Sequence, residues 1–526
     1  NIFERENEED KCYEDEIIYH LEKLGQNHKA IRYCVDSSEK MLKLKNREGA
    51  LVILNKALSL LNTEDYILKI ELLIKISKLY EDDANYKSAI NYGKDAESIC
   101  IKIGEKRLLV DVYNLLGSAY LKFSKLDKAI ECIRASENLL MNMDYEKAYI
   151  KNRFILARIY LKNDENEKAI SICNSAIELC GENHIKYKAI LFSILGEAYM
   201  ELNRAKDAIK SYKESYKCSE SINYRKGIVV ALNNLGIIYG DYYQKEDKME
   251  ECLVKAKEIC ETDKFVYYEI ISLINLGRVY LYKYDYEKSL KYFLEGLNKS
   301  REIDFEKMFF YSLNQLSMAY LRTNNYEMAY RYYTLSQQEF KNCRKQVIDE
   351  ANFYRLQGEF LFNIGYMEKA KEYIKKAVNI LSMRKFALKW RSEIQLQYIN
   401  IIEEKIPENI NKHINKIEKL LSNFKKYNEF DIVYHTAIIL YKKGKKDLAT
   451  NICNKYLYNF NENSNPKIKL RYMHLKSILS QDNNKIELMN SALKLSDKLN
   501  EQKIKYELCM EIGDWYLDRN QYIKGA

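Results

Sequence analysis

A pattern of two residues recurs about every 40 residues along most of the 526 positions of this sequence. Each copy has a small residue, which we call the first small site, and a tyrosine three positions later. We call this recurring alignment the register. The small residues are Ser77, Gly117, Ala157, Gly196, Gly236, Gly277 and Ser317, and the tyrosines are Tyr80, Tyr120, Tyr160, Tyr199, Tyr239, Tyr280 and Tyr320. A period of this length predicts an array of similar units that stack on one another.

A second small site follows the first by about twelve residues in almost every unit. Its residues are Ala89, Ala129, Ala169, Ala208, Ser289, Ala329 and Ala370, and Met249 is the exception. Helices that cross at a short distance need a small residue where they touch. The two small sites therefore predict one close helix crossing in each unit, and the tyrosine is expected to fill the groove beside it.

The stretch 109–136 shows the unit most clearly, because two helical patterns flank a short polar break. Its Leu116-Gly117 pair, followed by Tyr120 and Ala129, resembles the signature of the tetratricopeptide (TPR) repeat, a helix–turn–helix unit. The resemblance implies an all-α fold, a right-handed α-solenoid of about 13 helix–turn–helix repeats with a period near 40 residues. A TPR usually has about 34 residues, so these hairpins are expected to be taller than usual.

Composition agrees with helix along nearly the whole chain. Only two prolines occur, Pro407 and Pro466, together with 17 glycines, so few residues would break a helix. No apolar run has the length of a membrane span, and the N-terminal residues are charged rather than signal-like.

Charges and cysteines limit the partners and the compartment. The 85 basic and 76 acidic residues are interspersed, which favours solvated helix faces over a nucleic-acid surface or a membrane-binding one. The 12 cysteines include no C-x-x-C pair, and Cys100, Cys180 and Cys260 recur at one repeat position, as small buried hydrophobes would. A reduced, cytoplasmic chain is expected.

The register predicts four segments. Residues 1–30 would form an N-terminal helix at the junction to a missing upstream domain, and 31–385 a regular array. Residues 386–430 would form a degenerate repeat with a possible bend, because Ile410 and Ile417 occupy sites where alanine is expected. Residues 431–526 would form further repeats, truncated at the end. The sequence starts without methionine and stops where a second helix should begin, so we expect an excised piece of a longer protein.

No residue pattern points to catalysis. The six histidines form no H-x-x-x-H pair and no cluster with cysteine at metal-ligand spacing. Phosphate-binding glycine loops and the nucleophile elbow are absent from the sequence. We therefore expect no enzyme activity, no metal site and no cofactor in this segment.

The TPR resemblance also implies a concave groove lined by the first helix of each repeat, at the positions three before and one after the first small site. Asn114, Asn233 and Asn314 could donate to and accept from the backbone of an extended peptide, and Arg158 and Arg278 could pair with a carboxylate. The competing interpretation is that asparagine is simply frequent beside the Leu-Gly pair of long-period TPRs and that these side chains are merely solvated. The predicted ligand-binding residues are Asn114, Ser193, Asn233, Asn314, Arg158, Arg278 and Arg355, and the one-after position includes Lys78 and Ser118.

The segment from Tyr19 to Leu61 resembles the start of the TPR arm of bacterial STAND-type signalling ATPases, where an H-x-x-K-x-G helix pair follows the nucleotide-binding module; here His20, Lys23 and Gly25 carry the pattern. Long-period arrays are also similar to motor-protein light chains, which a composition typical of low-GC bacteria disfavours, and to peptide-sensing regulators of Gram-positive bacteria.

These resemblances imply a non-catalytic sensor arm of a larger bacterial signalling or transcription-regulatory protein. Its groove would bind a peptide, a protein or a small inducer and transmit a change of superhelix to an attached nucleotide-binding, DNA-binding or output domain. The alternatives are a peptide-pheromone receptor of a quorum-sensing transcription factor and a passive assembly scaffold.

Overall fold

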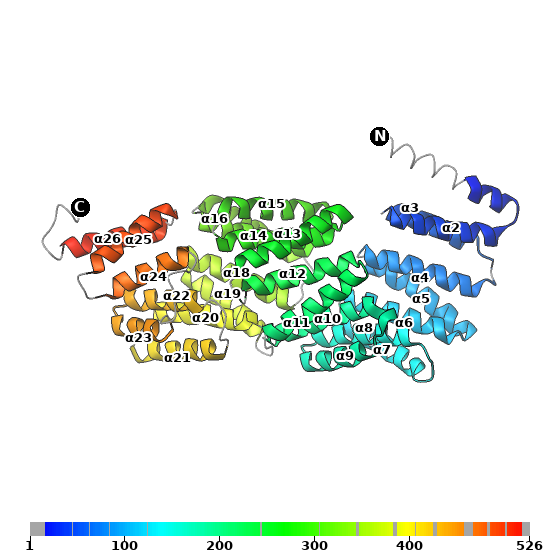
Figure 1. The fold of residues 1–526 in the computed structure, drawn as a ribbon, viewed down its shortest axis with the longest axis horizontal. Helices are drawn as coiled ribbons and strands as arrows, with labels where there is room; N and C mark the ends of the chain where they lie inside the picture. Colours follow the sequence, from blue (N-terminus) through cyan, green and yellow to red (C-terminus); the bar gives the residue numbers. More distant parts are fainter. Residues whose placement is uncertain are drawn as a thin grey trace. The chain divides into compact units, whose positions relative to one another are not determined.

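A computed structural model describes residues 16–517 of the chain, apart from short stretches, most of them between helices. The stretches outside the description are 45, 63, 84, 124, 203, 242, 244, 284, 304–305, 324, 343–346, 382–386, 405–406, 424–428, 457–465, 481–483 and 500–501. Every regular element of the described part is a helix (Figure 1), so the predicted all-α solenoid of TPR-like repeats is confirmed. None of these helices is both long and apolar enough to cross a membrane.

The chain divides into two compact units, residues 1–200 with 206–231 and residues 201–205 with 232–526. The first unit contains α2 (Asn27–Lys43), α3 (Arg47–Ser59), α4 (Tyr66–Asp82), α5 (Tyr86–Ile103), α6 (Lys106–Lys122), α7 (Leu126–Leu140), α8 (Glu146–Lys162), α9 (Asn166–Leu179), η1 (Glu182–His184) and most of α10 (Ile185–Glu201) and α11 (Ala205–Ser221). Helix α12 (Arg225–Asp241) begins in the first unit and ends in the second.

The second unit continues the same alternation of helices. It contains α13 (Glu246–Asp263), α14 (Val266–Lys283), α15 (Tyr286–Glu302), α16 (Glu306–Arg322), α17 (Tyr326–Asn342), α18 (Val347–Asn363), α19 (Met367–Ile380), α20 (Ala387–Glu403), α21 (Pro407–Asn423), α22 (Glu429–Lys442), α23 (Lys446–Tyr456), α24 (Pro466–Leu479), α25 (Lys485–Lys498) and α26 (Gln502–Leu517). Consecutive helices pack as hairpins, with α4 on α5, α6 on α7, α14 on α15 and α18 on α19.

The first small site is where the two helices of a hairpin touch. A Cβ atom added to Gly117 would lie 2.8 Å from the Ile133 side chain, and one added to Gly277 would lie 2.5 Å from the Phe293 ring. Real Cβ atoms do not approach carbon this closely, so the crossing distance requires glycine. The steric reason behind the predicted register is therefore confirmed at these crossings.

Serine replaces glycine at several crossings and adds a hydrogen bond there. The hydroxyl of Ser77 donates to the Ala89 carbonyl oxygen at 2.7 Å, and that of Ser317 donates to the Ala329 carbonyl oxygen at 3.0 Å. Each bond joins the first small site of a repeat to the second. A small polar side chain therefore fits the crossing because its only polar group is satisfied there.

In three repeats the recurring tyrosine packs against an aromatic residue of its own hairpin. The ring of Tyr80 stacks on Tyr92, and that of Tyr280 stacks on Tyr292, with ring centroids 5.4 Å apart in both pairs. Tyr320 and Tyr332 repeat the arrangement at 5.5 Å. The expected groove-filling role is correct, and offset stacking adds to the burial of these rings.

Met249 departs from the register, and the structure compensates for it. Met249 is fully buried where other repeats carry alanine or serine. A Cβ atom added to Gly240 would lie 2.2 Å from the Met249 sulfur atom. In other repeats the position of Gly240 holds a larger residue, such as Leu121 or Leu281. Compared with the other repeats, the large and the small residue have changed places between these two sites. This conserves the packed volume.

The predicted segment boundaries stay predictions. Pro407 begins α21, at the helix position that tolerates proline best, and Ile410 and Ile417 are buried on that helix. Residues 1–15 and 518–526, which belong to the predicted junction and the predicted truncated end, lie outside the described residues. The bend expected within 386–430 is not tested by these observations.

The cysteines at the shared repeat position are buried, as predicted. Cys100, Cys180 and Cys260 are each at most 5% exposed, and none of these three forms a disulfide. Burial raises the pKa of the Cys100 thiol to about 11 and that of Cys260 to about 12. These thiols stay protonated near neutral pH and act as small packing groups.

Candidate functional site

The predicted ligand-binding asparagines are buried between helices. Asn114 is fully buried, and its amide donates to the Ala148 carbonyl oxygen of α8 at 3.2 Å. The Asn233 amide donates to the Ser272 hydroxyl of α14 at 3.0 Å. These bonds connect first helices of neighbouring repeats, so the expectation that the amides face an open groove is wrong.

Asn314 and Ser193 are also buried. The amide of Asn314 donates to the Phe310 carbonyl oxygen at 3.0 Å, and its carbonyl accepts from the Gln357 amide of α18 at 3.0 Å. Ser193 on α10 is 9% exposed. Because each asparagine amide already has a partner in the fold, a ligand role for them stays an untested prediction with a structural alternative.

The three predicted arginines belong to different units. Arg158 is exposed on α8 of the first unit, whereas Arg278 and Arg355 belong to the second. Arg278 donates to the Asn275 side chain at 3.2 Å, and Arg355 pairs with Glu359 at 2.8 Å. Two of the three guanidinium groups are therefore engaged within the second unit.

The inner face of each unit is formed by first helices. Those of neighbouring repeats contact one another, as α4 does with α6 and α6 with α8. Within the described residues, successive second helices such as α5 and α7 have no contact of comparable extent. The array therefore curves toward its first helices, and the side chains between α4, α6 and α8 line the concave side.

Two carboxylates on the inner face of the first unit bridge neighbouring first helices. Glu81 of α4 accepts a hydrogen bond from the Ser118 hydroxyl of α6 at 2.5 Å and pairs with Lys122 at 3.0 Å. Asp111 of α6 accepts from the Tyr145 hydroxyl, just before α8, at 2.8 Å. Both carboxylates are thus committed to contacts that hold α4, α6 and α8 together.

Three lysines lie beside these carboxylates, and we call them the lysine cluster: Lys78 of α4 with Lys147 and Lys151 of α8. Partial burial lowers the pKa of Lys151 to about 8, and the positive charges of Lys78 and Lys147 add to this effect, while Asp111 and Glu81 oppose it. Burial likewise lowers the pKa of Lys78. The lysine cluster therefore brings several positive charges near one another beside only two carboxylates.

Further groups complete the surroundings of the lysine cluster. Lys226, at the start of α12, faces the ends of α4 and α6, where it interacts with Asp82 and Lys122, and burial lowers its pKa. One turn beyond Lys151, the ring of Phe154 stacks on that of Tyr187 with centroids 6.3 Å apart. An apolar wall therefore stands next to a group of cations.

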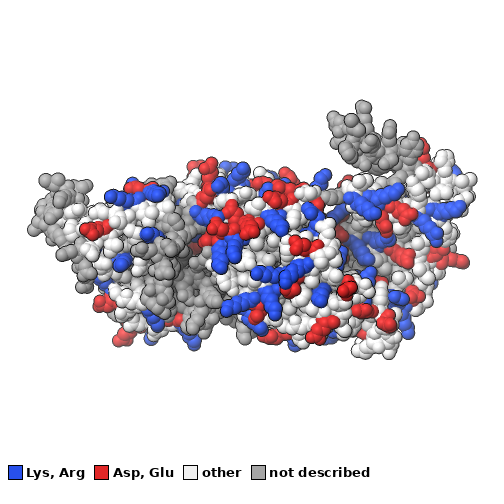
Figure 2. Space-filling model, in the orientation of Figure 1, with Lys and Arg blue, Asp and Glu red and all other residues white. Residues whose placement is uncertain are grey.

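Elsewhere positive and negative side chains alternate over the visible surface (Figure 2). This agrees with the predicted solvated helix faces. The lysine cluster was not predicted from the sequence, because only Lys78 of its three members lies at an expected groove position.

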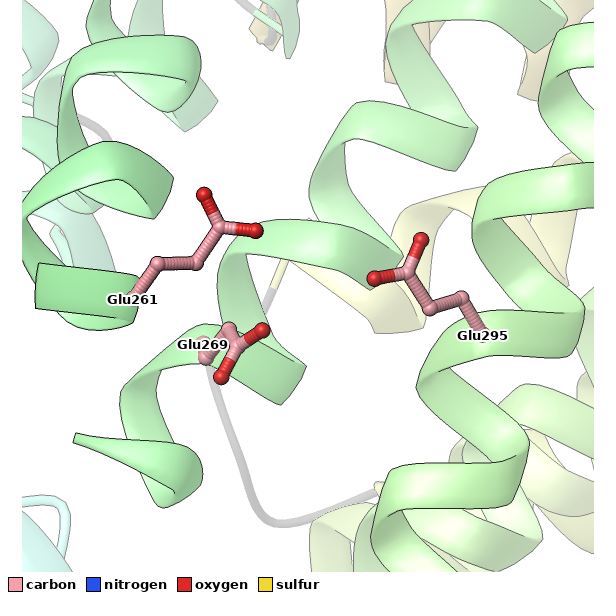
Figure 3. Close-up of side chains that lie close together, drawn as sticks. All are labelled: Glu261, Glu269 and Glu295. Atoms are coloured by element: carbon pink, nitrogen blue, oxygen red, sulfur yellow. The ribbon is translucent and has the colours of Figure 1, made fainter. Parts of the chain in front are cut away.

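Three glutamates of the second unit also approach one another. Oxygen atoms of Glu261, Glu269 and Glu295, from α13, α14 and α15, lie within 4.8 Å of each other (Figure 3). Lys299 pairs with the buried Glu269 at 2.8 Å, and Lys257 pairs with Glu261 at 2.5 Å. Two lysines thus offset two of the three charges, and the approach is explained without a metal ion.

A pocket of about 440 Å³ lies at the end of α9, between α10 and α11. Cys180, Cys218 and Lys188 are among its lining residues. Burial raises the pKa of the Cys180 thiol to about 11, and it also raises that of Cys218. Neither thiol is activated as a nucleophile, since the thiolate is the reactive form.

Comparison with known proteins identifies the repeats. The tetratricopeptide repeat family matches residues 110–139, 150–183 and 351–380. The TPR repeat-containing protein MJ1428 of Methanocaldococcus jannaschii is 26% identical over 331 residues, which are 59% of this chain and 52% of that protein. The ancillary SecYEG translocon subunit of Buchnera aphidicola is 29% identical over 123 residues, 23% of this chain and 58% of that protein. The chain spans about half the length of these relatives.

Two solved structures illustrate the fold comparisons. The STAND protein with a tetratricopeptide repeat sensor from Pyrococcus horikoshii is 19% identical, with a TM-score of 0.43, over 71% of this chain and 55% of that one. The apo form of the quorum sensor NprR from Bacillus thuringiensis is 12% identical, with a TM-score of 0.46, over 69% of this chain and all of that one.

Proposed function

Since this chain is a solenoid of tetratricopeptide repeats, we propose that it is a ligand-binding sensor arm without a catalytic centre of its own. It would belong to a larger cytoplasmic protein that regulates signalling or transcription in a bacterium. The domain that reads out the signal would be attached to one of its ends. The single observation that carries the proposal is the inner face of the first unit, where cations and an aromatic pair stand side by side.

The inner face of the first unit supports binding because its lysines and aromatic rings lie near one another and remain at least partly exposed. Lys78 and Lys147 are exposed and Lys151 is partly exposed. Phe154 and Tyr187 are also partly exposed. A surface that combines apolar area with a few convergent polar groups is the usual character of a ligand site.

The repeat architecture supports transmission of a signal. Each repeat of a solenoid contacts mainly its neighbours, so a ligand that draws α4 and α8 together alters the spacing at α6 and shifts the repeats that follow. The amide bridges from Asn114 to α8 and from Asn233 to α14 join neighbouring first helices. They would pass such a shift from one repeat to the next.

A photo-crosslinking experiment tests the proposal. A photoreactive phenylalanine analogue would replace Phe154 on the inner face or, as the control, Val52, which is 69% exposed on α3. Both variants would be irradiated in cells that make the complete protein, and adducts would be identified by mass spectrometry. We expect a specific small-molecule or peptide adduct at position 154 and none at position 52.

The opposite pattern would overturn the sensor arm. Adducts only at position 52 would mean that partners use the outer surface, as in a passive assembly scaffold. A peptide adduct at position 154 would favour a peptide receptor of the quorum-sensing type. The radius of gyration from small-angle X-ray scattering, with and without the identified ligand, separates a switching arm from a rigid one.

A further inference from the structure

We propose that the lysine cluster of the first unit binds a small anion carrying two or more negative charges, such as a pyrophosphate group or a tricarboxylate. The proposal rests on the sensor function above and names the chemical class of its ligand. The anion would lie on the inner face between α4 and α8, held by Lys78, Lys147 and Lys151.

The lysine cluster has cations without close counter-charges. Within the described residues, no carboxylate oxygen lies within 4.0 Å of the amino group of Lys78, Lys147 or Lys151. By contrast, Lys75, one turn before Lys78, pairs with Glu39 at 2.8 Å. The fold therefore leaves an opening for negative charge at this place.

The nearby carboxylates are unable to fill that opening. Asp111 is held by the Tyr145 hydroxyl and Glu81 by Ser118 and Lys122. Their contacts connect neighbouring helices, so turning them toward Lys151 would break those connections. Around the amino group of Lys151, the three lysines of the cluster stand against two carboxylates, Glu81 and Asp111.

Crowding of like charges explains why a multivalent anion fits better than a single one. The pKa of Lys151 falls to about 8 first because protein surrounds its amino group, and next because Lys78 is near. One anion that contacts both amino groups would remove their repulsion and supply the solvation that burial has taken away. An anion with one charge compensates only one of them.

Burial also limits the size of the ligand. Lys151 is only partly exposed, whereas Lys78 and Lys147 are exposed. A compact anion reaches all three amino groups, whereas an extended acidic chain would reach mainly the exposed two. The stacked rings of Phe154 and Tyr187 bound the site on the side of α10.

The site predicts a distinctive pH dependence. The groups that face Lys151 are Lys78 and Glu81 from α4, Asp111 from α6 and Lys147 from its own helix. The amino group must be protonated to bind an anion, so affinity should fall as pH rises through about 8, earlier than for an ordinary lysine. Bound anion would in turn raise the pKa of Lys151, and binding near pH 8 would take up protons.

Isothermal titration calorimetry tests the proposal on the whole chain, at fixed ionic strength because surface attraction is screened by salt. The probes are pyrophosphate, citrate and a hexaglutamate peptide, and sodium chloride sets the background. We expect the chain to bind pyrophosphate or citrate, and the K151M and K78M variants to bind at least about ten-fold more weakly. The matched control is K168M, which removes an exposed lysine of α9 that pairs with Glu165, and it should bind like the unaltered chain.

A second variant makes the test independent of folding. K151R keeps the charge but does not titrate in this range, so it should bind citrate while losing the fall in affinity near pH 8. Citrate is the suitable probe for this comparison across pH because its carboxylates stay ionised above neutral pH. Pyrophosphate without citrate would indicate a phosphorylated ligand, and the reverse would indicate a carboxylate ligand.

Several outcomes would overturn the anion site. They are equal binding by K151M and K168M, binding of hexaglutamate alone, and no binding above the chloride background. The sensor proposal fails separately: an adduct at position 154 without anion binding would keep the sensor and reject the anion. Anion binding without an adduct or a change in radius of gyration would keep the site and reject the switch.

Discussion

The inner faces of the two units use equivalent repeat positions in different ways. In the first unit, Lys78 follows the small site by one position and has no carboxylate within ion-pair distance among the described residues. In the second unit, the equivalent residue is Glu359, which pairs with Arg355 at 2.8 Å and accepts from Gln395 at 3.2 Å. The same backbone geometry therefore supports an open charged face in one unit and a self-satisfied one in the other.

The repeat register thus determines where a side chain lies, whereas the side chains around it determine whether it is available to a ligand. Glu359 is engaged because an arginine occurs four residues earlier on the same helix, an arrangement that favours an ion pair. Lys78 has Glu81 three residues later on its own helix, but Glu81 pairs with Lys122 of α6 instead. Four experiments test this contrast, and their expected effects decrease from the first to the last.

The largest effect concerns what the two units share, the close helix crossing. G277L would drive a side chain into the buried Phe293 ring, only 2.5 Å from the position of the first added atom. We expect a loss of about 3 kcal/mol in unfolding free energy, measured by urea denaturation. G181L is the control, since nothing lies within 4 Å of an added Cβ there and its φ is −73°. Equal effects of the two changes would refute the assigned crossing.

The amide bridges come next, because they occur in both units. N114A and N314A each remove a buried amide whose partners lose their hydrogen bond, which should cost about 1–3 kcal/mol. Thermal unfolding followed by circular dichroism measures the loss. An unchanged Tm together with weaker ligand binding would instead support the predicted role of these asparagines in binding a ligand.

The third experiment uses the pH dependence of the unfolding free energy to test the inner face of the first unit. The pKa of Lys151 is about 8 when folded and near 10.5 when unfolded, so between these values the unfolded chain binds more protons. The free energy of unfolding therefore rises through this group as pH increases from about 8 to 10.5. At pH 7 the charged Lys151 destabilises the folded chain. K151M should raise unfolding free energy at pH 7 by about 1 kcal/mol after allowance for solvent screening. The gain should shrink by pH 10, whereas K168M should show no such trend.

The smallest effect concerns the closed face. R355M removes the ion pair with Glu359, which is partly exposed, and should cost about 1 kcal/mol or less. Anion binding by the chain should not change, because Arg355 belongs to the other unit. Weaker pyrophosphate binding by R355M in calorimetry would show that the contrast between the two faces is mistaken.

Repeat periodicity was sufficient to predict the hairpins, the small crossing sites and the tyrosine packing, because each depends on residues close together in the chain. Gly117 and Ile133, or Tyr80 and Tyr92, belong to one hairpin and repeat with its period. The exchange of size between Gly240 and Met249 was not predicted, since it appears only when the contact is known.

The binding side chains were harder to predict, because they depend on how successive hairpins rotate against each other. A position three residues before the small site was expected to face a groove, yet at Asn114 it points between α6 and α8. Lys151 lies outside the expected groove positions, and its approach to Lys78 requires the curvature of three repeats. The Phe154 ring, by contrast, is at an expected groove position and is partly exposed.

The serine bonds at the crossings have a consequence for how the chain is made. Ser77 reaches a carbonyl only 12 residues later, and Asn114 reaches one 34 residues later. Contacts this local allow fast folding, so each hairpin can close on a nascent chain soon after its second helix leaves the ribosome. The lysine cluster forms later, when α8 has docked, and the repulsion among its amines arises only after the preceding hairpins are in place.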